Sequence, residues 1–243
     1  MSDPSRTIVR PASFASRSFL YRRLEAAGAR FTDVGGTAVA MDFHDEISEL
    51  KVAKRLAIAD LSPLPRVGFK GPDTMTWLTN NGVLIDGSKP NWSWRQNDGA
   101  LAITRSPNEA LILTALSTKS DLCAQLESKS YKSMETRTYI LPRYHGLFWF
   151  VLTGSDASAC IAKMCGVDLR TSAFPNSSVA QSSMARVSTI VVRADLGSTN
   201  TYHLLGDSAS AEYFWDAMRD AMSEFAGGLV GLSSVQSLDP DFK

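Results

Sequence analysis

The sequence contains few of the residues that bind metals or carry nucleophilic catalysis. There are three cysteines and three histidines in 243 residues: Cys123, Cys160, Cys165, His44, His145 and His203. Their spacing matches no zinc-binding pattern, and an odd number of cysteines does not make a closed disulfide framework. The sequence therefore predicts no metal site and a reduced, cytoplasmic setting.

An excess of charge of either sign is also absent, because 25 Lys and Arg residues balance 25 Asp and Glu residues. Electrostatically driven nucleic-acid binding requires a basic surface, so this class of function is excluded. Residues 1–16 lack the apolar core of a signal peptide, and no apolar run approaches the length of a membrane span. We therefore expect a soluble protein with no nucleic-acid or membrane partner, whose near-zero net charge suits a permanent protein partner.

Motifs for phosphate binding and serine hydrolysis are missing as well. Gly35-Gly36 and Gly227-Gly228 are isolated pairs without the later glycines of a dinucleotide-binding loop, and no Gly-x-Ser-x-Gly occurs. His145 precedes an apolar run and His203 lies within one, where a histidine is more often packed or hydrogen-bonded than catalytic. The residues by themselves indicate no active site.

The sequence does contain a repeated pattern of strand, polar turn and helix. Its C-terminal copy is the clearest: residues 190–192 and 202–205 are β-branched and aromatic and predict paired strands. Apolar residues spaced by three or four over 211–225 predict an amphipathic helix, closed by Gly227-Gly228. The strand at 147–152 begins a similar unit. Such repeats predict an α+β fold with helices packed against mixed sheets.

The N-terminal half is predicted to contain a short helix at 18–27 and strands at 30–34 and 37–41 around a glycine turn. A helix is predicted at 44–57; residues 58–62 end it and lead to a strand at 66–69. Asp73 is placed to cap the next helix. Residues 80–98 form a long loop with Trp92 and Trp94. The two tryptophans are interpreted either as an interface or stacking surface or as a cover for the core edge, and the sequence does not decide between these interpretations.

Two sets of segments resemble known proteins. Residues 19–29, 33–36, 56–62 (Leu-Ala-Ile-Ala-Asp-Leu-Ser) and 71–73 (Gly-Pro-Asp) resemble the opening of the glycine-cleavage aminomethyltransferase (T-protein) family. The C-terminal part resembles the gamma subunit of heterotetrameric sarcosine oxidase, which is a small relative of that fold. The residues that carry this resemblance are 165–170, Phe174, 179–187, 203–205 and 209–215. The resemblance implies a T-protein-like folate-binding fold over residues 17–234, with an extended arm at 1–16 and a tail at 235–243.

The resemblance also locates the family's functional positions. The catalytic aspartate of T-proteins lies in a Gly-x-Ile-Asp-Asp-Leu-type motif, which corresponds here to 98–101 (Asp-Gly-Ala-Leu), so that Asp98 is the remaining carboxylate. The pterin-binding glutamate lies in a segment that corresponds to 198–203, which places His203 at its position. An imidazole lacks the two acceptor oxygens that pair with the N–H and NH2 donors of a pterin.

These departures imply a non-catalytic accessory subunit of gamma type. The expected partners are larger flavoprotein subunits that carry FAD or FMN and NAD, with tetrahydrofolate as the one-carbon acceptor elsewhere in the complex and no cofactor held by this chain. The expected substrate is an N-methyl amine; sarcosine is favoured, and N-methylglutamate or dimethylamine remain open.

Two alternatives stay open. The first is a stand-alone folate-dependent methyl or aminomethyl transferase, in which Asp98 acts as the base and Arg193, Tyr202 and His203 contact the pterin. The second is a scaffold whose partner is not a flavoenzyme.

Overall fold

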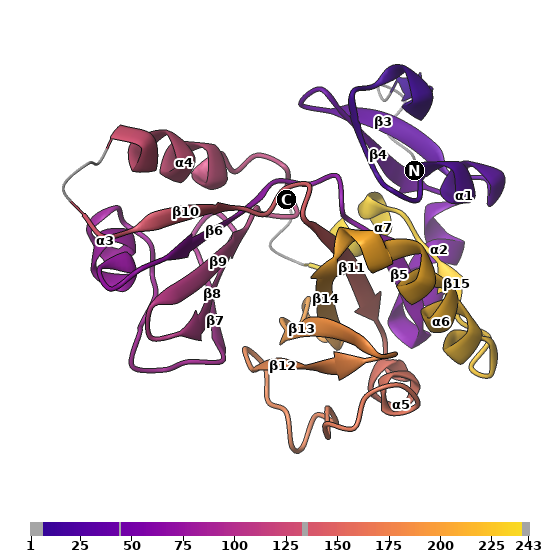
Figure 1. Ribbon diagram of the computed structural model, residues 1–243. Coiled ribbons are helices and arrows are strands. Elements are labelled where there is room, and N and C mark those ends of the chain that lie inside the picture. The colour runs from indigo at the N-terminus through magenta and orange to yellow at the C-terminus, as the bar shows by residue number, and fades with distance from the viewer. Residues whose placement is uncertain (1–6, 44, 133–135, 240–243) are drawn as a thin grey trace.

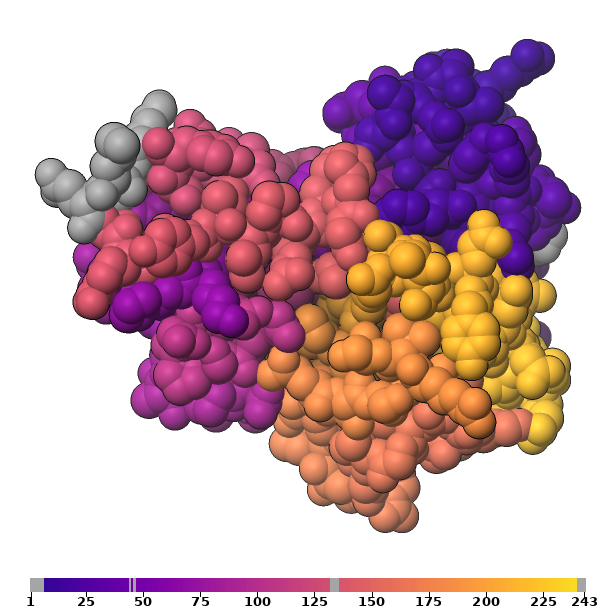
Figure 2. Space-filling view, in the orientation of Figure 1, coloured from indigo at the N-terminus to yellow at the C-terminus, as the bar shows by residue number. Residues whose placement is uncertain are grey.

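The computed structural model describes residues 7–43, 45–132 and 136–239 and contains three β-sheets with helices packed on their faces (Figure 1). In the space-filling view, the three sheets with their helices form three adjoining lobes (Figure 2). None of the helices in the described residues has the length and apolarity to cross a membrane. The arrangement confirms the α+β prediction.

The first sheet has four strands and lies near the N-terminus. Its order is β1 (Ile8–Val9), β3 (Arg30–Val34), β4 (Thr37–Asp42) and β2 (Ser16–Arg17). The predicted glycine turn connects β3 to β4, with φ of +60° and +83° at Gly35 and Gly36. The arm predicted at 1–16 supplies β1, a single turn η1 (Pro11–Ser13) and β2, while residues 1–6 lie outside the described chain. Helix α1 (Tyr21–Ala26) follows β2.

The second sheet has five antiparallel strands. Its order is β10 (Tyr139–Pro142), β6 (Arg66–Lys70), β9 (Glu109–Leu113), β8 (Leu101–Ser106) and β7 (Trp92–Arg95). Helices α3 (Thr74–Asn80) and α4 (Leu122–Lys132) cover one face and bury a core that includes Phe69, Ile112, Trp77 and Leu126. The opposite face of this sheet points toward the third sheet.

The third sheet has six strands, in the order β12 (Val179–Met184), β13 (Val187–Arg193), β14 (Thr201–Asp207), β11 (Leu147–Thr153), β5 (Ala57–Asp60) and β15 (Gly228–Leu229). Helices α5 (Ala157–Ala162) and α6 (Ala211–Ser223) pack on one face, and α6 buries the predicted apolar stripe against Phe148 and Phe150. The other elements are α2 (Glu46–Arg55), η2 (Ser208–Ser210) and α7 (Leu232–Gln236).

Strand β11 separates two hydrophobic cores, one on each face of the third sheet. Phe148, Phe150 and Leu152 face α6, whereas Trp149 and Val151 face the second sheet and pack with Leu101 and Leu113 among other residues. Alternate residues of a strand point to opposite faces, and a strand that is buried on both faces reads as one continuous apolar run.

Four predictions about local structure were wrong. The helix predicted over 44–57 ends at Arg55, and its predicted start, His44, lies outside the described residues. Residues 57–60 form strand β5, because Ala57, Ile58 and Ala59 are buried on both faces of the third sheet. The loop at 80–98 contains a strand, β7, which pairs with β8.

The other two errors concern helix ends. The carboxylate of Asp73 does not cap α3 but binds the backbone N–H and the guanidinium of Arg137. After α6 the left-handed residue is Ala226, at φ +48°, and not a glycine. Gly227 is required for another reason: a Cβ there would lie 2.9 Å from side-chain atoms of Leu56 and of Met222.

A buried arginine joins the second and third sheets. Arg66, on β6, is 1% exposed and donates to the carbonyl oxygens of Ser62 (2.9 Å), Leu64 (2.8 Å), Tyr144 (2.6 Å) and Leu147. Ser62 and Leu64 belong to the connection from β5 to β6, Tyr144 belongs to the connection from β10 to β11, and Leu147 is the first residue of β11. Burial lowers the pKa of Arg66 to about 10, so the guanidinium remains charged at neutral pH.

We therefore expect Arg66→Lys to destabilise the protein by about 2 to 4 kcal/mol, because a lysine cannot donate to four carbonyls from a planar fork. The free energy of unfolding, measured by urea denaturation, checks this expectation. Arg22→Lys is the matched control, since Arg22 is exposed and its replacement should change the free energy by less than about 0.5 kcal/mol. An equally small effect of Arg66→Lys would show that the junction does not depend on the guanidinium.

Candidate functional site

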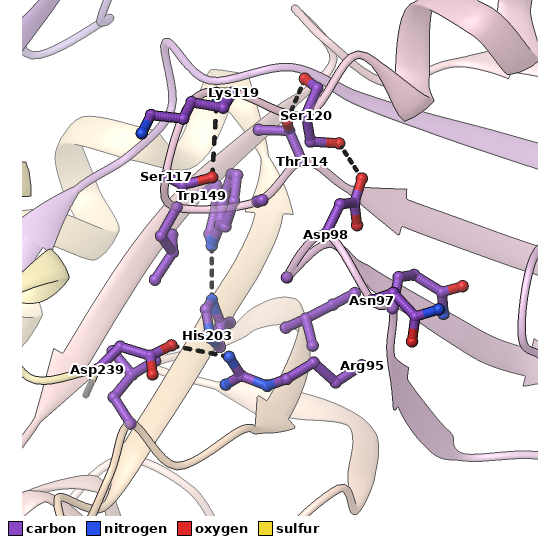
Figure 3. Close-up of a pocket in the computed structure, with 16 residues that line it drawn as sticks. Arg95, Asn97, Asp98, Thr114, Ser117, Lys119, Ser120, Trp149, His203 and Asp239 are labelled. Carbon is purple, nitrogen blue, oxygen red and sulfur yellow. Dashed lines mark hydrogen bonds and ion pairs between the residues drawn. The ribbon is translucent and has the colours of Figure 1, made fainter. Parts of the chain in front are cut away.

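A cavity of about 460 Å³ lies between the second and third sheets. Its wall includes the end of β7, the β7–β8 turn at 96–99, the segment 114–120, and one residue each from β8, β11 and β14 (Figure 3). Leu196, between β13 and β14, and Asp239 complete it. The volume is within the range of small-molecule sites in proteins.

Trp149 and His203 form the wall that belongs to the third sheet. They lie on adjacent strands, with Trp149 opposite Leu205 and His203 opposite Val151, so that both side chains are on the face toward the second sheet. The indole Nε1 of Trp149 donates a hydrogen bond of 3.0 Å to Nδ1 of His203, and both side chains are at most 1% exposed.

This hydrogen bond determines where the imidazole proton lies. An indole N–H can only donate, so Nδ1 of His203 must be unprotonated to accept it. Burial, with a further contribution from the positive charge of Arg95, lowers the pKa of His203 to about 3. The ring is therefore neutral at pH 7 and carries its proton on Nε2, which is buried and has no hydrogen-bond partner among the described residues.

Asp98 lies in the β7–β8 turn, where Gly99 adopts φ +88°. Its carboxylate accepts a hydrogen bond from the backbone N–H of Ala100 (3.0 Å) and another from the hydroxyl of Ser120 (2.5 Å). One of these bonds stabilises the turn, and the other joins the turn to the segment 114–120 across the cavity wall. Each oxygen of Asp98 thus accepts one hydrogen bond.

Three further charged side chains border the cavity: Arg95, Lys119 and Asp239. Arg95, at the end of β7, forms an ion pair with Asp239 at 2.9 Å and also donates to the carbonyl oxygen of Asp195 at 3.3 Å. Lys119 lies on the segment 114–120 and is exposed. In Figure 3 its side chain extends away from His203.

Arg193 and Tyr202 do not line this cavity. They lie opposite each other on β13 and β14, on the face of the sheet away from His203. The hydroxyl of Tyr202 donates to the carbonyl oxygen of Leu169 (2.8 Å), and Arg193 makes two hydrogen bonds to the carboxylate of Asp195 (3.1 and 2.7 Å). Of the four candidate residues in the sequence, the structure brings Asp98 and His203 to one cavity and places the other two elsewhere.

Sequence reasoning missed Trp149 and Arg95. Trp149 lies in the apolar run 147–152, for which the sequence predicts only a strand, and only the register of β11 against β14 reveals that its N–H meets His203. Trp92 and Trp94 are both half-buried, and neither lines the cavity. Trp94 packs against the core of the second sheet, whereas the ammonium of Lys89 lies 3.4 Å from the centre of the Trp92 ring.

The cysteine thiols and the possible metal ligands form no further site in the described residues. A second cavity of about 310 Å³ lies on the other side of the segment 114–120 and contains Cys123, whose pKa burial raises to about 12. A thiol with this pKa is protonated at neutral pH and is a poor nucleophile. All three cysteines are free and buried. Within the described residues, no group of three or more His, Cys, Asp or Glu side chains is arranged to hold a metal ion.

Comparison with models of protein families finds no match, and comparison with curated protein sequences finds none. Solved structures do match. A chain of heterotetrameric sarcosine oxidase from Corynebacterium sp. U-96, in complex with pyrrole 2-carboxylate, is 16% identical with a TM-score of 0.61, and the match covers 75% of this chain and 93% of that one.

The glycine cleavage system aminomethyltransferase T from Bartonella henselae is 14% identical with a TM-score of 0.70. This match covers 91% of the present chain and 61% of the aminomethyltransferase. At such low identity the likeness establishes the fold alone. The chain therefore has a T-protein-like fold, which confirms what the sequence resemblance implied.

The residues of the cavity do not fit a tetrahydrofolate held in the manner that the resemblance implies. The N–H and NH2 groups of a pterin require acceptors, whereas His203, which the sequence resemblance places at the pterin-binding position, has Nδ1 occupied by Trp149 and only a donor left at Nε2. Tyr202 is fully buried on the other face of the sheet and cannot stack on a ligand there.

The buried neutral imidazole predicts a specific loss of stability in acid. The unfolded chain protonates His203 near pH 6.5, whereas the folded chain does so only near pH 3. Stability from this residue is therefore complete above pH 6.5 and falls as the pH drops toward 3, by about 2 kcal/mol at pH 5. Urea denaturation at pH 7.5 and pH 5 measures the difference.

His203→Gln should lose this component of the pH dependence. His145→Gln, which removes an exposed imidazole, is the matched control and should retain it. If wild type and His203→Gln lose the same stability between the two pH values, His203 is not the buried neutral group that the structure describes.

Proposed function

We propose that the chain is a non-catalytic accessory subunit, of gamma type, in a multi-subunit oxidase or demethylase that uses flavin and tetrahydrofolate and acts on an N-methyl amine. A sarcosine oxidase-like enzyme is the favoured complex. Its partners are larger flavoprotein subunits that hold FAD or FMN and NAD, and the complex works in the cytoplasm. This chain contributes an interface and a folded scaffold.

The observation that carries the proposal is the extent of the structural match. The shared fold accounts for 93% of a chain from a heterotetrameric sarcosine oxidase but for only 61% of the aminomethyltransferase. In the first protein, this fold is thus almost a whole chain within a larger assembly. The match to a chain of a heterotetrameric enzyme supports the role of a subunit.

The chemistry of the cavity supports the same proposal. The basic nitrogen of His203, Nδ1, already accepts the N–H of Trp149, and the hydrogen bonds of Asp98 hold its turn to the segment 114–120. A general base needs a free lone pair within reach of the proton that it removes. The alternative, a stand-alone folate-dependent transferase, is favoured only by the presence of Asp98 and His203 in one cavity.

Affinity purification of the tagged chain from its native cells tests the proposal. We expect a larger polypeptide to co-purify and the eluate to be yellow, with the absorbance bands of an oxidised flavin. The control is an unrelated tagged protein of similar size, prepared from the same cells. A colourless chain without a partner, which binds tetrahydrofolate in a titration, contradicts the proposal and favours the transferase.

Substitution of Asp98 in the purified assembly distinguishes an accessory subunit from a folate-dependent transferase. Asn retains an acceptor for the N–H of Ala100, so we expect Asp98→Asn to leave demethylation of the N-methyl amine within about twofold of wild type. A catalytic base at this position would instead lower kcat by about 10²-fold or more. Asp86→Asn, at another exposed turn, is the matched control for effects on solubility and assembly.

A further inference from the structure

We propose that residues 117–120 are a gate between the two cavities, and that its opening joins them into one space. The first cavity, of about 460 Å³, lies between the second and third sheets. The second, of about 310 Å³, contains Cys123 and reaches Val34, Gly35 and Thr37 of the first sheet. The inference concerns this chain alone and holds whether or not the chain works within a flavoenzyme.

The first argument is that the gate itself forms the wall between the cavities. Ser117 and Lys119 line the first cavity, Thr118 lines the second, and Ser120 lines both. Successive residues of one short segment thus border opposite spaces. Lys119 is exposed and the other three residues are half-buried, so little buried packing holds the segment in place.

The second argument is backbone strain in the closed conformation. Thr118 adopts φ +58°, in the left-handed region, which is rare for a β-branched residue because its Cβ crowds the backbone. The backbone N–H of Thr118 donates to the carbonyl oxygen of Ala115 at 3.0 Å and so closes a turn. Such strain persists only where neighbouring contacts maintain it, and it reduces the free energy that is needed to leave the conformation.

The third argument is the small number of hydrogen bonds that hold the gate closed. Within the part of the chain that the structure describes, residues 117–119 make hydrogen bonds only to the segment 114–120 itself. Ser120 provides the contact across the first cavity, because its hydroxyl donates to the carboxylate of Asp98 at 2.5 Å (Figure 3). Its carbonyl oxygen also accepts a long hydrogen bond of 3.4 Å from the hydroxyl of Thr114.

The residues before the gate are anchored, so the gate can move while the fold stays intact. The backbone N–H of Thr114 donates to the carbonyl oxygen of Pro65 at 3.1 Å. The side chain of Gln236 donates to the carbonyl oxygen of Leu116 at 2.7 Å. Helix α4 begins just after the gate, at Leu122. A short strained segment between fixed ends is the arrangement expected of a local opening.

The test uses Cys123 as a reporter in the second cavity. Its thiol is 4% exposed and has its pKa raised to about 12 by burial, so alkylation by N-ethylmaleimide is slow unless the site opens. Cys160, which is fully buried in the core of the third sheet, reports wider unfolding. Peptide mass spectrometry measures both rates in the full chain, in the assembly in which it purifies. We expect Cys123 to react at least about tenfold faster than Cys160.

Three substitutions distinguish a strained gate from a loop that is merely flexible. Thr118→Gly removes the left-handed strain and should slow the alkylation of Cys123 by about threefold, because the closed conformation is then favoured. Lys119→Gly is the matched control at a residue whose φ is not positive, and it should accelerate the reaction by about twofold. Ser120→Ala removes the hydrogen bond to Asp98 and should accelerate it by about fivefold. The rate at Cys160 should stay the same in all three variants.

Hydrogen–deuterium exchange of the peptide that spans 117–120 gives a second readout without the cysteine and should rank the variants in the same order. Acceleration by Thr118→Gly would overturn the inference, and so would equal rates at Cys123 and Cys160 in the wild type. A single rate at Cys123 in all variants also contradicts it, because the second cavity is then entered by a route that avoids the gate. None of these results depends on whether a flavoprotein co-purifies, so the inference and the proposed function fail independently.

Discussion

The structure depends on one buried arginine where two sheets meet. The chain passes between the second and third sheets twice, through the connections at 61–65 and 143–146, and Arg66 donates to carbonyl oxygens in or beside both connections. Unpaired carbonyls in this position would carry the cost of lost hydration. A single planar guanidinium donates to four of them and so holds the two connections between the sheets together. Burial lowers its pKa only to about 10, so the charge survives in the core.

The cavity is a consequence of that junction. Its two principal walls belong to different sheets, and the segment 114–120 that closes one side is attached through the N–H of Thr114 to the carbonyl of Pro65, beside Arg66. The hydrogen bond between Ser120 and Asp98 then ties this segment to the β7–β8 turn. The positions of the site residues are thus set by backbone geometry far from the cavity, which is why rigid scaffold residues greatly outnumber the polar groups that face the ligand space.

Sequence periodicity predicted the elements that bury one clear face, such as α6 and the pair β13–β14. It failed where a short strand is buried on both faces: β5 has the composition Ala-Ile-Ala-Asp, which is equally compatible with a helix end. It also failed for the site. Alternation along β14 already separates Tyr202 from His203, but the contact between His203 and Trp149 requires the register of β14 on β11. Arg66 could not be assigned either, because only the folded chain brings its carbonyl partners together.

Trp149 sets the hydrogen-bonding state of His203, although its own N–H is not free for any other contact. Trp149 uses its only hydrogen-bonding group on His203, and this contact converts an amphoteric side chain into a donor alone. Side-chain contacts of this kind can differ between proteins that share a fold. Likeness of fold at 14 to 16% identity therefore says little about ligands. The orientation of one imidazole is the more informative observation.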